Sequence, residues 1–299
     1  MGLSGRLNST QIESYNYSAI LKFMPLNRRT LTKELLFEFS HGDESIQYSI
    51  WLSDPSAPIN CVVFLGTVQI GKLPAWIARD CPPGVAIIQG APHWKAKTDA
   101  SDLYEFMHRF TESALANVLN MHRAARISII TDSQATPKAL EILSKGNYIG
   151  IVASLVLVQP LSLNPKAFGV NGIETLKARV KSNLRHQLSF IPIDRRLIYN
   201  HRQILRVIGY DNAAADAQYA LGLATDSIEP LKKLRAAHIP ITIVCGEKDE
   251  LFPPHEIEEH LQENNLDISV LVVKNTPHSP LPTKQGMRLF RQALEIRHE

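Results

Sequence analysis

Short apolar runs rich in β-branched residues alternate with helical patterns along most of this 299-residue chain. Four such runs precede residue 160, at residues 61–65, 85–89, 127–130 and 149–158, and the clearest helix between them spans residues 101–124. Alternation of this kind is typical of a mostly parallel sheet that has helices on both faces. The pattern therefore predicts an α/β fold.

The pattern also divides the chain into segments. Residues 1–30 are a polar N-terminal extension, and residues 33–40 and 45–51 predict a hairpin. Strand signals stop after Pro160 and return at Ile241, and the interval has helical patterns instead. We therefore expect a first part of the α/β core at 31–161, a helical segment at 162–236, and a second part of the core at 237–299.

Two loops near the C-terminus follow predicted strands, and each places a polar side chain after its strand. Asp249 follows the run at 241–244, and His278 follows the run at 268–273. An acid and a His in the loops after neighbouring parallel strands are what a charge-relay site needs. The carboxylate fixes the imidazole tautomer, so that the imidazole can take a proton from a nucleophile.

The nucleophile candidate is Ser133, which lies between the apolar run at 127–130 and a helix-forming stretch at 138–144. A Ser at a tight strand-to-helix turn holds its hydroxyl clear of the backbone. The amide of the next residue, Gln134, is then free to stabilise an oxyanion. The alternative is that Ser133 and Thr136 are only helix caps.

The order Ser133, Asp249, His278 resembles the α/β-hydrolase superfamily, over roughly residues 31–299. This resemblance implies a catalytic triad made of these residues and a helical cap at 162–236. It also implies a second oxyanion amide, that of Thr67 after the strand at 61–65. The sequence departs from the family pattern in having Leu65 where a His is usual, and Thr131 and Ala135 where the elbow has glycines.

The implied reaction is hydrolysis of a carboxylic ester, thioester or lactone through an acyl-enzyme; the same residues could also hydrolyse a carbon–carbon bond. Two alternatives stay open. One is a non-catalytic binding protein with the same fold, which the irregular elbow favours. The other is a nucleotide-binding protein that uses Gly66 to Lys72, although Leu73 stands where a magnesium-binding Ser or Thr is needed.

The predicted cap is rich in basic residues, although the formal net charge of the whole chain is only +3. Between 166 and 206 only Glu174 and Asp194 oppose Lys166, Lys177, Arg179, Lys181, Arg185, Arg195, Arg196, Arg202 and Arg206. We expect Arg195 and Arg196 to attract an anionic substrate, such as a coenzyme A thioester or one linked to an acyl carrier protein. The alternative is a solvated helical surface.

Composition and motifs limit the remaining possibilities. The chain is 44% hydrophobic and 20% charged, as is usual for a globular protein. Its three cysteines favour core thiols in a reducing compartment, and no signal peptide or membrane span is expected, so we predict a cytoplasmic protein. His255 and His260 are five residues apart, which is wrong for a helical metal site, so they indicate a solvated helix face. We expect no metal, no cofactor and no nucleic-acid partner, and the oligomeric state stays open.

Overall fold

The computed structural model describes residues 32–41, 44–66, 77–78, 81–88, 100–163, 172, 174–176, 178–179, 225, 227–278 and 284–296. The predicted N-terminal extension, Thr67, Arg195 and Arg196 lie outside these residues, as does most of the Gly66 to Lys72 motif.

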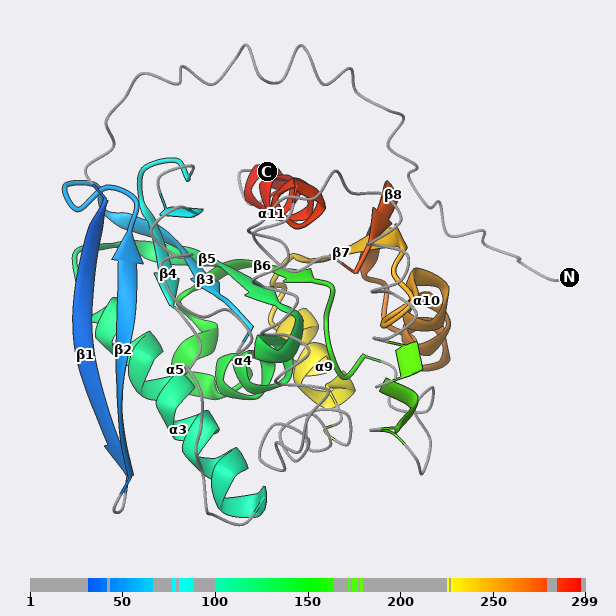
Figure 1. Ribbon diagram of the computed structural model, residues 1–299, viewed down its shortest axis with the longest axis horizontal. Coiled ribbons are helices and arrows are strands. Elements are labelled where there is room, and N and C mark those ends of the chain that lie inside the picture. Colours follow the sequence, from blue (N-terminus) through cyan, green and yellow to red (C-terminus); the bar gives the residue numbers. More distant parts are fainter. Residues whose placement is uncertain are drawn as a thin grey trace, which may run out of the picture.

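Eight strands form one sheet in the order β1-β2-β4-β3-β5-β6-β7-β8 (Figure 1). They are β1 (Lys33–His41), β2 (Glu44–Leu52), β3 (Ile59–Phe64), β4 (Val85–Ile88), β5 (Arg123–Asp132), β6 (Val152–Val158), β7 (Ile241–Lys248) and β8 (Ser269–Pro277). The β1–β2 hairpin is antiparallel, and β2 also runs antiparallel to β4. All other neighbours are parallel. The predicted mostly parallel sheet is confirmed.

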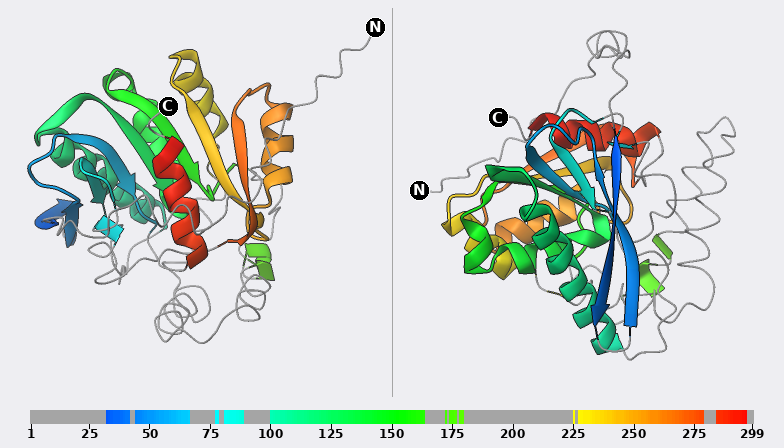
Figure 2. Two further views of the ribbon diagram at one scale, coloured as in Figure 1. Left: turned by 90° about the horizontal axis from the view of Figure 1, so that it is seen from above. Right: turned by 90° about the vertical axis from the view of Figure 1, so that its left-hand side faces the viewer.

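Helices cover both faces of the sheet (Figures 1 and 2). Their bounds are α3 (Ala100–Leu119), α4 (Thr136–Leu143), α5 (Gly146–Ile149), α9 (Ile228–Ala236), α10 (Pro254–Glu263) and α11 (Lys284–Ile296). Alternate strand residues enter two separate clusters: Val62 and Phe64 pack with α3, α4, α9 and α10, whereas Cys61 and Val63 pack with α11. This alternation explains the continuously apolar strands, since both faces of each are buried.

Two boundaries differ from the sequence-based expectations. The apolar run predicted as a strand at 149–158 becomes a strand only from Val152, because residues 146–149 form the short helix α5. The last nine residues of the predicted cap form α9, whose Ile228, Leu231 and Leu234 enter the core beneath the sheet. Hydrophobic spacing alone does not separate a cap helix from one that packs on a sheet.

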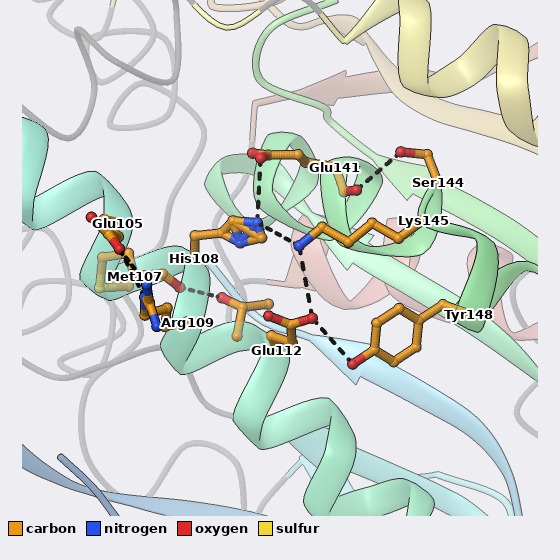
Figure 3. Close-up of polar contacts among 10 residues, drawn as sticks. Glu105, Met107, His108, Arg109, Glu112, Glu141, Ser144, Lys145 and Tyr148 are labelled. Atoms are coloured by element: carbon orange, nitrogen blue, oxygen red, sulfur yellow. Dashed lines mark hydrogen bonds and ion pairs between the residues drawn. The ribbon is translucent and has the colours of Figure 1, made fainter. Parts of the chain in front are cut away.

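A polar cluster joins α3 to α4 and to the start of α5 (Figure 3). The Lys145 ammonium donates to Nε2 of His108 at 3.2 Å and lies 3.7 Å from the Glu112 carboxylate, while Glu141 lies 3.3 Å from the same imidazole nitrogen. Burial is the main reason that the pKa of His108 is lowered, with Lys145 adding to the effect against Glu141. A neutral imidazole is what accepting from an ammonium requires.

The described residues include three cysteines, Cys61, Cys81 and Cys245, which are all buried and form no disulfide within this part of the chain. Within the same ranges, no helix has both the length and the apolar character needed to cross a membrane.

Candidate active site

Ser133 occupies a sharp turn between β5 and the helices that follow it. Asp132 ends the strand with extended backbone, whereas Ser133 has φ 47° and begins a short 3-10 helix, Ser133–Ala135, which leads into α4. This left-handed conformation is unusual for a residue other than glycine and persists only where the surrounding chain enforces it. A tight, strained turn from a strand into a helix is the backbone form that a nucleophile elbow needs.

A hydroxyl pair ties the two sides of this elbow together. Oγ1 of Thr131 lies 3.0 Å from Oγ1 of Thr136, and both side chains are fully buried. The N-cap residues of the two helices are Asp132 and Ala135, and neither makes a side-chain capping hydrogen bond. Ser133 and Thr136 are therefore not the N-cap residues of these helices, and Thr136 is the C-cap residue of the 3-10 helix. Thr131, although larger than the usual glycine, is accommodated and has a hydrogen-bond partner.

Asp249 and His278 contact each other beyond the ends of β7 and β8. Oδ2 of Asp249 lies 2.9 Å from Nδ1 of His278, and Oδ1 accepts the backbone N–H groups of Leu251 and Phe252, each at 2.9 Å. The Asp249 side chain is fully buried, and that of His278 is 12% exposed. The Phe252 ring packs edge-on to the imidazole at 5.2 Å. The Nδ1 side of the imidazole therefore faces the carboxylate, as it does in a charge-relay pair.

The pKa of His278 is raised above its usual value. Burial is the largest single influence and would lower this pKa, but the charge of Asp249, its hydrogen bond to the ring and the charge of Asp132 together outweigh it. Asp132 is the buried residue immediately before Ser133. The elbow and the imidazole therefore share one electrostatic environment.

A glycine makes the close approach of the two loops possible. A side-chain carbon on Gly246 would stand 2.2 Å from the carbonyl oxygen of Thr276, nearer than such atoms can approach. The register between β7 and β8 shifts just after Gly246, and pairing resumes at Lys248 and Pro277. Asp249 directly follows Lys248, and His278 directly follows Pro277. The glycine therefore helps to set the distance between Asp249 and His278.

The chain leaving β3 passes beside the elbow. A side-chain carbon on Gly66 would stand 3.3 Å from the carbonyl oxygen of Asp132 and 3.8 Å from the amide nitrogen of Gln134. Gln134 is buried in the first turn after Ser133. Thr67 follows Gly66 directly but lies outside the described residues. The pairing of the Thr67 and Gln134 amides as an oxyanion hole stays a prediction.

Solved structures resemble this chain over most of its length. The α/β hydrolase MGS-M2 from a Medee basin deep-sea metagenome library is 15% identical, covers 88% of this chain and 98% of its own, and has a TM-score of 0.57. E-2-(acetamidomethylene)succinate hydrolase is 15% identical, covers 88% of this chain and 99% of its own, and has a TM-score of 0.56. This chain has the α/β-hydrolase fold. No protein-family model and no curated protein matches it.

A third structural neighbour is the thioesterase domain from the curacin biosynthetic pathway. It is 12% identical, covers 89% of this chain and 100% of its own, and has a TM-score of 0.54. At such identities the comparison establishes the architecture, which places Ser133, Asp249 and His278 after β5, β7 and β8. Because these strands are parallel, all three residues lie at the same edge of the sheet.

The α/β-hydrolase fold of this chain buries a histidine that the sequence placed at the surface. His260 of α10 is 7% exposed, so the expectation of a solvated helix face is wrong for this residue. Its Nδ1 lies 3.7 Å from the Glu263 carboxylate. Across the described part of the chain, no group of three or more His, Cys, Asp and Glu side chains is arranged to hold a metal ion.

Sequence reasoning missed two features around the candidate site. The sequence pattern does not predict that the charge of Asp132 raises the pKa of His278. The pattern predicts Arg179 only as a basic cap residue, whereas in the structure its side chain binds Glu256. For Asp132 the available signal was its position beside the nucleophile. For Arg179 there was none, since its partner lies 77 residues away.

Proposed function

We propose that this chain is a serine hydrolase that cleaves a carboxylic ester, thioester or lactone through an acyl-enzyme, with Ser133 as nucleophile, His278 as base and then acid, and Asp249 as the orienting carboxylate. The observation that carries the proposal is the 2.9 Å contact between Asp249 and His278, at the sheet edge where Ser133 occupies a left-handed elbow. An orienting acid, an imidazole and a serine at such a turn are the parts that acyl transfer needs.

In the acylation step, the Ser133 oxygen attacks the acyl carbon as its proton moves to Nε2 of His278. The carbon–oxygen or carbon–sulfur bond to the leaving group then breaks, and the imidazolium gives its proton to the departing alcohol or thiol. Asp249 keeps Nδ1 protonated and stabilises the imidazolium by its charge. Asp132 adds a second negative charge that favours the same state.

In the deacylation step, a water molecule takes the place of the leaving group. Nε2 removes its proton as the water oxygen attacks the acyl carbon, and Ser133 recovers the proton when the acid is released. The negative oxygen that forms in both steps would be stabilised by the amide of Gln134 at the start of the helix, together with that of Thr67.

The substrate class follows from the charge of the predicted cap. The excess of Lys and Arg between 166 and 206 supports an anionic acyl substrate, such as one linked to coenzyme A or to an acyl carrier protein. Arg195 and Arg196 are the two cap residues that we assign to this attraction. Arg179 is excluded from it because Glu256 already pairs with its guanidinium.

A fluorophosphonate probe tests the nucleophile, because such a probe modifies only an activated serine. We expect labelling on Ser133, and we expect Ser133→Ala to lose labelling together with about 10³-fold or more of the turnover of a short-chain p-nitrophenyl ester. Ser144→Ala is the matched control, since it removes another serine hydroxyl at the far end of α4, where it binds the Glu141 carbonyl. Wild-type protein that is folded but resists the probe would reject the proposal.

The second candidate is a binding protein with this fold and no turnover. Thr131 at the first glycine position of the elbow is the observation that favours it, because a catalytic elbow usually has glycine there to avoid crowding the neighbouring backbone. In that case Ser133→Ala would leave ligand affinity unchanged, and neither wild type nor variant would react with the probe.

A further inference from the structure

Arg179 joins the segment after β6 to the loop that holds Asp249. Its Nη1 donates to the carbonyl oxygen of Leu251 and to Oε2 of Glu256, each at 3.0 Å, and its Nη2 donates to Oε1 of Glu256 at 3.0 Å. Glu256 lies in the first turn of α10, directly after this loop. A single guanidinium therefore binds the loop and the helix that follows it at the same time.

The pair is built to be stronger than an ordinary surface ion pair. The side chains of Arg179 and Glu256 are only 21% and 22% exposed, and the two guanidinium nitrogens each meet a different carboxylate oxygen. Two parallel, charge-assisted hydrogen bonds fix orientation as well as distance. Leu176, three residues earlier, is buried in the main core and anchors the segment from which Arg179 extends.

Leu251 connects the Arg179–Glu256 pair to the candidate active site. Its carbonyl accepts from Arg179, and its N–H donates to Oδ1 of Asp249 at 2.9 Å. The next N–H, that of Phe252, binds the same carboxylate oxygen, and the Phe252 ring packs on His278. Residues 251 and 252 therefore orient both members of the Asp249–His278 pair, and Arg179 holds them from outside.

We propose that Arg179 is a positioning residue for the charge relay: by binding Glu256 and the Leu251 carbonyl together, it keeps the turn after β7 in the form that aims Asp249 at His278. The inference rests on the proposed function, because it assigns Arg179 a role in that site. It makes a residue of the predicted cap region part of the catalytic support and removes it from substrate binding.

The relay geometry can be measured without any substrate. In Ser133→Ala protein, ¹³C-labelled imidazole carbons report the pKa of His278, which the charges facing the ring, Asp249 and Asp132, raise. If the Arg179–Glu256 pair orients Asp249, then Arg179→Gln and Glu256→Gln should each lower the pKa of His278. The double variant should lower this pKa no further than either single variant, because the two residues act as a unit. Arg179→Lys keeps the positive charge but cannot donate two parallel hydrogen bonds to the Glu256 carboxylate, so it should also lower the pKa of His278.

Turnover gives an independent measurement in protein that retains Ser133. We expect kcat to fall about tenfold in Arg179→Gln with little change in KM, since displaced catalytic groups slow the chemical step. Arg109→Gln is the matched control: it removes an Arg–Glu pair within α3, where Arg109 binds Glu105 at 2.6 Å, and both readouts should keep their wild-type values.

The outcomes separate the two proposals. An unchanged His278 pKa and kcat in Arg179→Gln and Glu256→Gln would overturn the positioning role, even if the melting temperature falls, because Arg179 would then be only a tether. If Arg179→Gln fails to fold, Arg179→Lys decides by the same two readouts. If no ester is cleaved at all, the proposed function fails, while the imidazole titration still decides whether Arg179 aims Asp249.

Discussion

At the scale of single residues, His278 is the group on which the proposed reaction depends. Its imidazole is buried enough that desolvation favours the neutral form, but the carboxylates of Asp132, at the end of β5, and Asp249, just after β7, oppose this and the pKa is raised. A general base must be neutral to accept a proton, so activity should be lost as the pH falls through the raised pKa. In the proposed reaction, the same raised pKa would stabilise the imidazolium that forms when His278 takes the serine proton.

Asp132 supplies one of these charges, and Asp132→Asn tests it. Removing the charge should lower the pKa of His278, so the acid limb of kcat/KM should move to lower pH. Glu259→Gln removes an equal charge from an exposed position of α10 and should leave the limb in place. The measurement is the pH profile of ester hydrolysis. An acid limb that stays fixed in Asp132→Asn would contradict this role.

Side-chain partners were harder to predict than the site residues themselves. The order of Ser133, Asp249 and His278 follows from strands that can be recognised by their apolar runs, and the structure brings Asp249 and His278 into contact. The bond between Thr131 and Thr136 depends on the backbone angles of the turn, and the pair of Arg179 and Glu256 depends on tertiary contact. Neither leaves a periodic signal in the sequence.

At the scale of secondary-structure elements, β7 and β8 lie so close together at Gly246 that no side chain fits between them. Gly246 faces the backbone of Thr276, and the loops with Asp249 and His278 begin just beyond this contact. The glycine has an ordinary negative φ, so the requirement is for space and not for backbone freedom. A substitution here should therefore act on the strand pairing and on the candidate site together.

Gly246→Ala should destabilise the protein by about 2 kcal/mol or more, because the β8 backbone must move to admit a methyl group. The displaced loops should also reduce fluorophosphonate labelling of Ser133 in the fraction that stays folded. Gly146→Ala is the control: a methyl group there meets nothing within 4 Å and lies in α5, so stability should stay constant or rise. Urea unfolding of both variants, with labelling at native pH, gives the comparison. Equal stabilities would show that β7 and β8 tolerate the extra atom.

At the scale of the whole molecule, the sheet could be predicted from sequence but the order of its strands could not. Apolar runs identify strands because both faces of this sheet are buried. Their spatial order, in which β3 lies between β4 and β5, depends on crossovers that leave no trace in local spacing. The same limit applies to α9, whose pattern suited a cap but which packs beneath the sheet. The resemblance to α/β-hydrolases rests on the loops with Ser133, Asp249 and His278. It predicted the overall architecture, which hydrophobic periodicity alone could not.

The distribution of charge over the molecule leads to a prediction about substrate binding. The whole chain has a formal net charge of +3, yet nine basic residues lie between 166 and 206 against two acidic ones. Glu256, from α10, neutralises Arg179. If the other cap cations attract an anionic acyl substrate, KM should rise with ionic strength while kcat changes little, because salt screens exposed charges. Arg195→Glu with Arg196→Glu should raise KM further at low salt.

The matched control for this pair is Lys232→Glu with Lys233→Glu, which makes the same change in net charge on α9, in the layer beneath the sheet. A local attraction by the cap predicts that KM responds to the first pair and not to the second, because exposed charges act over about 10 Å at 0.1 M salt. Equal responses would instead indicate that net charge alone steers the substrate. A KM that is flat with salt in all three proteins would leave the basic cap residues as a solvated surface.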